Sequence, residues 1–378
     1  MSRKSHRFRF AGAAVLLTGL SLLLPALRNG EPLLYLLAIG VTGGMILALL
    51  ILPRLFSLDR FVFTLSLFLG VLPVAALAHI NPQTAASQAL LCLAGIVLLL
   101  VGASVGRFFP SALLTGLIAS FIGLLMLAVR LAGPTLQLDL SEAAVPVLLI
   151  GCAALLPVHG GVTALFPGVL GMVLLVLQSQ PVMAVIWTAV FAALLWSTGD
   201  RIAWSVPLLP VLLFLLLRYV PPVVQAALPA ETASADSLSR LVSAGLWGAD
   251  AASVQSIEIQ GASLLDPFVS CFGLIFAGLS LLLWPTVSLR GMFIATVART
   301  RFHACLAMGC SLFFALRTVA ALLAAFSVFP IPLTEVPFLT SSLPALGAQY
   351  FALGLVCGIS GKNDADLAED AHLAMLAK

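Results

Sequence analysis

Few side chains in this sequence could carry charge or acid–base chemistry, and the most unusual of them is Arg317. It lies near the middle of an apolar stretch, residues 302–329, in a chain that is 61% hydrophobic and only 9% charged. A guanidinium at that depth in hydrocarbon costs roughly 2.5 kcal/mol or more, so it usually faces a cavity or a partner. Arg317 therefore either forms a structural pair, with Glu142 or Asp266, or handles an anionic substrate in a polar cleft.

Two carboxylates stand at predicted helix starts. Glu142 follows Ser141 at the start of one apolar segment, and Asp266 precedes Pro267 at the start of another. Such carboxylates could act on a substrate, but a first-turn acid also stabilises a helix N-terminus without any catalytic role. Three further polar side chains lie in a long acidic stretch and could contact a substrate or only water. They are Ser253, Gln255 and Glu258.

The segments that must position these side chains are apolar, and most approach the roughly 20 residues needed to cross the hydrocarbon of a bilayer. A mean hydropathy of +1.16 excludes a soluble domain, whose surface must be largely polar. The sequence therefore predicts an all-α polytopic membrane protein with about twelve transmembrane helices. The predicted segments are residues 11–27, 32–52, 61–79, 88–105, 112–131, 143–156, 163–177, 181–197, 202–220, 268–284, 302–329 and 343–359.

The distribution of Lys and Arg predicts the orientation of these segments. Of the 18 Lys and Arg residues, thirteen fall on flanks and loops that share a side with the N-terminus, four fall on the other side, and Arg317 lies within a segment. Cationic loops stay in the cytoplasm, so both termini are predicted to be cytoplasmic and the polar stretch 221–266 to be outside.

Several classes of function lack their sequence signatures. The chain has no P-loop, no dinucleotide-binding fingerprint and no zinc-protease helix, so no cofactor and no metal are predicted. The net charge of +3 follows from the excess of cations on one side of the membrane, and no nucleic-acid partner is predicted.

Three short stretches match motifs of a known family in the same order. Residues 140–142 (Leu-Ser-Glu) are similar to a Gln-Pro-Ser-Glu helix start. Residues 243–248 (Ser-Ala-Gly-Leu-Trp-Gly), followed by 253–258, are similar to a Ser-Gly-Gly-Leu-Phe-Gly loop with its Ser-x-Gln and Pro-Glu. Residues 329–337 resemble a Leu-Pro-Leu-Thr-Gly-x-Pro turn. Together they resemble the SEDS (shape, elongation, division, sporulation) family of FtsW/RodA/SpoVE-like cell-cycle membrane proteins.

The resemblance implies a domain plan. Residues 58–360 would form a ten-helix SEDS-like membrane domain, with the large extracellular loop 221–266 between its seventh and eighth segments. Residues 1–57 would form an N-terminal two-helix addition, and residues 361–378 a cytoplasmic tail. The expected localisation is the bacterial cytoplasmic membrane.

The resemblance also implies an activity. The family polymerises lipid II, a lipid-linked peptidoglycan precursor, into glycan strands during cell division or cell-shape control, with a class B penicillin-binding protein as partner. Such a glycosyltransferase needs a carboxylate to accept a proton and groups that hold a diphosphate leaving group. The candidate catalytic residues are Asp266 and Glu258. The candidate substrate-binding residues are Arg317, Glu142, Ser253 and Gln255.

Departures from the family pattern leave alternatives open. Counted back from residues 272–273 without gaps, the family's loop aspartate falls on Ala262, four residues before Asp266, and the family's lysine after Ser-Glu is replaced by Val145. A degenerate paralogue without turnover is therefore an alternative to an active enzyme. A third hypothesis is a multi-spanning transporter or lipid-linked precursor flippase, with Arg317 in the translocation path.

Overall fold

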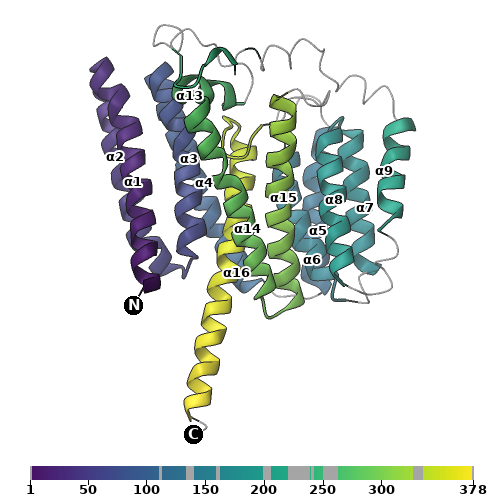
Figure 1. The fold of residues 1–378 in the computed structure, drawn as a ribbon. Helices are drawn as coiled ribbons and strands as arrows, with labels where there is room; N and C mark the ends of the chain where they lie inside the picture. Colours follow the sequence, from purple (N-terminus) through teal and green to yellow (C-terminus); the bar gives the residue numbers. More distant parts are fainter. Residues whose placement is uncertain are drawn as a thin grey trace.

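The chain is a bundle of helices that stand side by side (Figure 1). The computed structural model describes residues 2–109, 113–132, 140–158, 162–198, 206–219, 239, 242–249, 263–326 and 335–376. These ranges contain no β-strand, only an isolated bridge between Ser263 and Thr340. The first helix begins, and the last helix ends, at the same end of the bundle (Figure 1). The predicted all-α fold is confirmed.

The described residues form thirteen helices, and each of the twelve predicted segments overlaps one of them or, in one case, two. The helices are α1 (Ser2–Asn29), α2 (Pro32–Leu55), α3 (Arg60–Ile80), α4 (Pro82–Phe108), α5 (Leu113–Ala132), α6 (Ser141–Leu155), α7 (Val162–Leu177), α8 (Pro181–Thr198), α9 (Leu208–Tyr219), α13 (Leu265–Leu281), α14 (Leu283–Thr296), α15 (Arg301–Ala325) and α16 (Leu343–Leu376).

The segment predicted at 268–284 is too short. The helical path continues through α14 to Thr296, so one crossing consists of two helices that meet at Leu282. Pro285 lies in the first turn of α14, where its missing N–H interrupts the helical hydrogen bonds to the preceding turn. The break is therefore the ordinary effect of a proline, and the crossing resumes directly after it.

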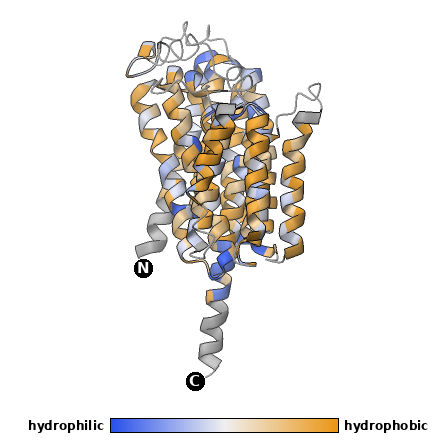
Figure 2. Cartoon of the chain, turned by 90° about the vertical axis from the view of Figure 1, so that its right-hand side faces the viewer, coloured by the Kyte–Doolittle hydropathy of each residue, from blue (hydrophilic) through white to orange (hydrophobic). Residues whose placement is uncertain are grey.

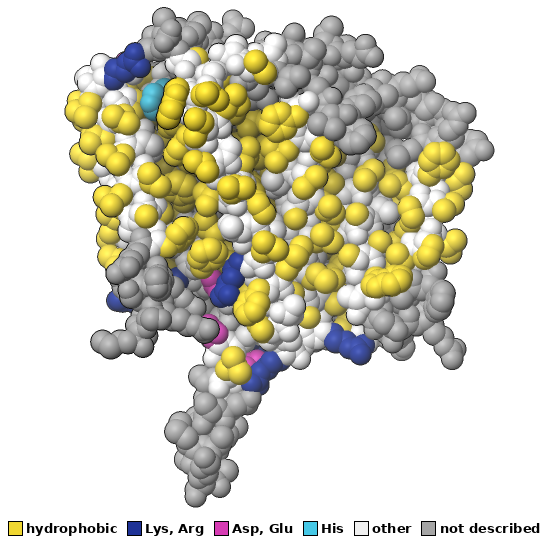
Figure 3. Space-filling view, viewed as in Figure 1, with side chains coloured by type: hydrophobic (Ala, Val, Ile, Leu, Met, Phe, Trp, Pro, Cys, Tyr) yellow, Lys and Arg dark blue, Asp and Glu magenta, His cyan; other side chains and the backbone are white. Residues whose placement is uncertain are grey.

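Hydropathy identifies the helices that can cross a membrane. Seven described helical segments are long and apolar enough to do so, and four shorter apolar helices accompany them. Hydrophobic residues, drawn in orange, extend along the length of the bundle, and hydrophilic residues gather toward its ends (Figure 2). Hydrophobic side chains likewise cover the middle of the face shown in Figure 3. This surface belongs in hydrocarbon, which agrees with a polytopic membrane protein.

Burial separates a central group of helices from those at the edge. In α3 and α16, 94% and 83% of the most apolar 18 residues are buried, against 28% in α1 and 17% in α2. α1 and α2 lie beside α3 at one edge of the bundle (Figure 1). Most of their apolar surface is consequently available to lipid.

Among the described helices, the most extensive contact joins α4 and α16, and it depends on glycine. A Cβ atom added at Gly102 would lie 2.3 Å from the carbonyl oxygen of Phe351, and one added at Gly358 would lie 2.0 Å from that of Ala103. Small residues allow two helix backbones to approach in a membrane, where lipid competes for apolar side chains. These glycines thus hold α16 directly against α4.

A polar contact at the same end as the chain termini joins three helices. One carboxylate oxygen of Asp59 caps α3 by accepting from the backbone N–H groups of Phe61 and Val62, at 3.0 and 3.1 Å. The other oxygen accepts from Arg290 of α14 at 2.6 Å and from the hydroxyl of Ser360 of α16 at 3.3 Å. Asp59 therefore links α3, α14 and α16.

We predict that Gly358→Ala lowers the melting temperature of the purified protein, because its Cβ forces α16 away from α4. Overpacking of this kind costs about 1–3 kcal/mol. Gly278→Ala is the matched control, since nothing lies within 4 Å of a Cβ at that helical position. Equal melting temperatures for the two variants would contradict the proposed role of close α4–α16 contact.

Candidate functional site

Three of the polar side chains singled out in the sequence, those of Glu142, Asp266 and Arg317, come from parts of their helices that lie toward the end of the bundle opposite the chain termini (Figure 1). Asp266 is half-buried in the first turn of α13, and Glu142 is in the first turn of α6. Arg317 lies sixteen residues beyond Arg301, which corresponds to about 24 Å along α15, and about 12 Å before Ala325. The three side chains thus come from three different helices of the same half of the bundle.

Arg317 forms a buried ion pair with Glu142. Its Nη2 donates to Oε1 of Glu142, and its Nη1 donates to the sulfur of Met183 on α8 at 3.1 Å. The Arg317 side chain is 4% exposed and that of Glu142 17%. Of the two pairings considered from the sequence, the structure contains the one with Glu142.

This pair decides what the guanidinium can do. The carboxylate neutralises the cation in a low-dielectric interior, where an unpaired charge costs several kcal/mol. Nε of Arg317 has no hydrogen-bond partner among the described residues. Glu142 is the more exposed member, so an anionic ligand that reaches Arg317 has to displace the carboxylate. Val145, one turn after Glu142, is fully buried and supplies no charge.

A segment before α16, residues 335–342, lies against the start of α13. Ser263 forms an isolated antiparallel bridge with Thr340, and the backbone N–H of Leu264 donates to the carbonyl of Leu339 at 3.0 Å. Asp266 follows two residues later. The position of this carboxylate is therefore set by backbone contacts with the 335–342 segment as well as by its own helix.

Side chains from neighbouring helices anchor the 335–342 segment through its backbone. Gln88 of α4 donates to the carbonyl of Thr340, and the indole of Trp284 donates to that of Pro337, at 2.9 and 2.8 Å. The backbone N–H of Phe338, which has a φ of 69°, donates to Gln349 of α16. A positive φ is costly for a side chain of this size, so the surrounding contacts must hold the segment in place.

Glu335 is a carboxylate at this end of the bundle that the sequence analysis missed. It is half-buried and accepts a hydrogen bond from the hydroxyl of Thr340. In the turn motif quoted above, it stands where the motif has glycine. An acid in a turn that otherwise needs a small residue is unexpected, so this difference from the motif could have identified Glu335 as a candidate site residue.

The glycine-rich motif of residues 243–248 lies on a break in α13. Gly273 has φ 77° and ψ 165°, which interrupts the helix, and the N–H of Leu274 donates to the carbonyl of Gly245 at 3.1 Å. A Cβ at Gly273 would lie 2.4 Å from the nitrogen of Gly248. Gly245 and Gly248 also have positive φ, a conformation that glycine adopts at little cost. The motif therefore packs on α13 only because the helix is interrupted at Gly273, and the motif in turn accepts the hydrogen bond from the N–H group of Leu274.

We predict that Gly273→Ala releases residues 242–249 from α13, because both the left-handed conformation and the close backbone approach exclude a Cβ. Hydrogen exchange of the N–H groups of Leu274 and Ile275, which donate to this motif, should become faster. Gly278→Ala, in the same helix and facing open space, should leave that exchange unchanged. Unaltered protection in Gly273→Ala would contradict this account of the motif.

The remaining candidates cannot be placed. Ser253, Gln255, Glu258 and also Ala262 lie outside the described residues. Within the described ranges, no group of three or more His, Cys, Asp or Glu side chains could hold a metal ion.

We predict that breaking the buried pair on one side destabilises the protein strongly. Arg317→Met or Glu142→Gln alone should lower the free energy of unfolding by about 3–5 kcal/mol, because each leaves one uncompensated buried charge. The double variant should recover most of the loss, since it buries no charge and methionine fills the space of the arginine stem. Single variants that unfold like wild type would show that the two charges do not depend on each other.

Comparison with known proteins places this geometry in a known fold. No family model matches the chain, and no curated protein matches it in sequence. Several solved structures match in shape, including the following three. A chain from a structure on the coordination of polymerization and crosslinking by a peptidoglycan synthase complex has 18% identity and a TM-score of 0.64, over 81% of this chain and 98% of that one.

The other two are structures of the rod shape determining protein RodA of Thermus thermophilus. The RodA structure has 18% identity and a TM-score of 0.57, over 80% of this chain and 96% of RodA. A variant of it with an aspartate changed to alanine has 16% identity and a TM-score of 0.55, over 80% and 97%. The chain therefore has the RodA-like fold of the SEDS proteins, an all-α polytopic membrane architecture.

Proposed function

We propose that this protein acts in peptidoglycan synthesis of the SEDS type, as a polymerase of lipid II in the bacterial cytoplasmic membrane. The observation that carries the proposal is the RodA-like fold, which extends over four fifths of this chain and nearly all of RodA. The three sequence motifs support it independently, since they occur in the family's order. Both termini are assigned to the cytoplasm, because most Lys and Arg residues fall on their side.

In the proposed reaction, the carboxylate of Asp266 accepts the proton of the attacking sugar hydroxyl. The hydroxyl oxygen forms the new bond to the anomeric carbon of the second sugar, and the bond from that carbon to the polyprenyl diphosphate breaks. The diphosphate leaves with the bonding electron pair. The position of Asp266 in the first turn of α13, beside the anchored 335–342 segment, supports this role. Glu258 is the second candidate base.

Arg317 is assigned to the leaving group through an exchange of partners. In the structure the charge of Arg317 is paired with that of Glu142, which is the more exposed of the two. A diphosphate that enters from the side of Glu142 competes with that carboxylate for the guanidinium, because phosphate oxygens accept the same bidentate, charge-assisted hydrogen bonds. Ser253 and Gln255 remain candidate contacts to the sugars, and a class B penicillin-binding protein is the proposed partner.

The decisive experiment is polymerisation of lipid II by the purified protein with and without such a partner. We expect wild type to form glycan strands and Asp266→Asn to lose at least a hundredfold in rate, which is the usual contribution of a general base. Glu31→Gln is the matched control. Glu31 is an exposed carboxylate between α1 and α2, and its side chain forms no capping hydrogen bond.

An inactive wild type would contradict the enzymatic part of this proposal. Ala262→Asp then separates the alternatives, because it restores an aspartate at the position counted from residues 272–273. Strands formed only by that variant would identify a degenerate paralogue with an intact substrate groove. Movement of labelled lipid II across vesicles without any polymer would instead support the flippase hypothesis.

A further inference from the structure

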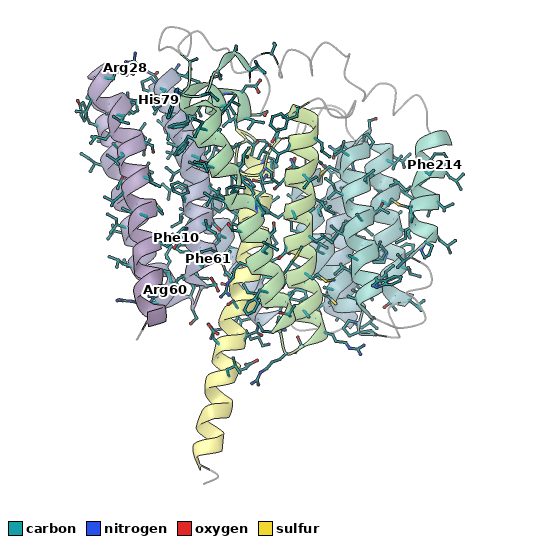
Figure 4. The ribbon with its side chains drawn as sticks, viewed as in Figure 1. Phe10, Arg28, Arg60, Phe61, His79 and Phe214 are labelled. Atoms are coloured by element: carbon teal, nitrogen blue, oxygen red, sulfur yellow. The ribbon has the colours of Figure 1, made fainter. Side chains whose placement is uncertain are left out.

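A groove lies at the end of the bundle that carries the chain termini, far from the candidate site. It has a volume of about 620 Å³ and is bordered by α1, α2 and α3. Phe10, Arg60 and Phe61 lie together at this end of α1 and α3 (Figure 4). The groove is therefore formed where the two N-terminal helices pack on the central helix α3.

The wall of the groove is apolar and opens toward lipid. The rings of Phe10 and Phe61 approach to 5.3 Å between centroids and join α1 to α3. Leu16, Ile46 and Leu50 line the groove and are 67%, 41% and 48% exposed. In a bilayer these exposed side chains meet hydrocarbon, so an acyl chain has direct access to the groove.

Two cations border the same groove. Arg54 in the last turn of α2 and Arg60 at the start of α3 both line it, and both are exposed. The described residues provide neither guanidinium with an ion-pair partner. The intervening acid, Asp59, is already engaged by Arg290 and by Ser360. The polar end of the groove therefore carries uncompensated positive charge.

The sequence adds further cations on the same side. Arg3, Lys4, Arg7 and Arg9 precede Phe10 within the first turns of α1. A cluster of Lys and Arg next to a membrane-spanning helix attracts anionic lipid headgroups. The combination of an apolar groove with cations at its membrane-surface end matches the chemistry of a phospholipid, which has an acyl chain and a phosphate.

We propose that this groove binds one anionic phospholipid of the cytoplasmic leaflet, with an acyl chain along α1 and α2 and its headgroup phosphate between Arg54 and Arg60. The positive charges of Arg54 and Arg60 select an anionic lipid over a neutral one. A neutral tail gains little from the groove because it lies in hydrocarbon wherever it is, so specificity comes from the two guanidiniums. The bound lipid contacts α1, α2 and α3 at once and holds the N-terminal helix pair on the rest of the bundle.

Gly12 allows the groove to be filled without disturbing the helices. Nothing lies within 4 Å of a Cβ at this position, although the residue lines the groove. A leucine there would occupy the space proposed for the acyl chain. Gly40 on α2 offers the same open surroundings and does not line the groove, so Gly40→Leu is the matched control.

The test is native mass spectrometry of the full-length protein titrated with phosphatidylglycerol, phosphatidylcholine of the same chains, diacylglycerol, or inorganic phosphate. We expect wild type to retain phosphatidylglycerol in preference to the other three. The double variant Arg54→Gln/Arg60→Gln should weaken that retention about 25-fold, fivefold for each guanidinium, which corresponds to about 1 kcal/mol each. Arg107→Gln, at the same end but outside the groove, should retain it like wild type.

Gly12→Leu should also lose phosphatidylglycerol, while Gly40→Leu should keep it. Undiminished retention in either Arg54→Gln/Arg60→Gln or Gly12→Leu would overturn the proposal, since the headgroup or the chain would then lie elsewhere. Equal retention of phosphatidylcholine would overturn it as well, and binding of inorganic phosphate alone would identify a free anion site in its place. None of these outcomes depends on polymerase activity.

Discussion

A charge that is withdrawn from water has to be neutralised by another side chain, and one such ion pair lies in each half of the bundle. Arg317 and Glu142, 175 residues apart, join α15 to α6 in the half of the candidate site. Arg290 and Asp59, 231 residues apart, join α14 to α3 in the half of the chain termini. Because an isolated buried charge costs several kcal/mol, each pair fixes which helices must be neighbours. Apolar contacts alone specify the choice of neighbouring helix less well, because an apolar helix face packs against lipid as favourably as against another helix.

Much of the fold could be predicted, because a membrane span leaves a strong local pattern. All twelve segments follow from runs of apolar residues, and the missing α14 was overlooked because Pro285 interrupts a run that otherwise continues. The site was less predictable. Glu142 and Asp266 were equivalent partners for Arg317 in the sequence, and only the helix arrangement distinguishes them. Likewise, the sequence around Gly273 does not indicate that the helix is interrupted there. The interruption depends on residues 246–248, which approach Gly273 from a separate segment.

The two candidate aspartate positions differ in a physically meaningful way. Ala262 precedes α13, whereas Asp266 lies within its first turn. The exposed N–H groups of a helix start stabilise an ionised carboxylate there. In the proposed function, Asp266 therefore acts from within the helix start, beside the anchored 335–342 segment.

The last helix gives the molecule a mechanical connection between its two ends. α16 begins at Leu343, directly after the 335–342 segment, and continues without interruption to Leu376, a length of about 51 Å. It leaves the bundle at the end of the chain termini and projects beyond it (Figure 1). α16 thus connects the 335–342 segment, through one continuous helix, to the opposite end of the bundle.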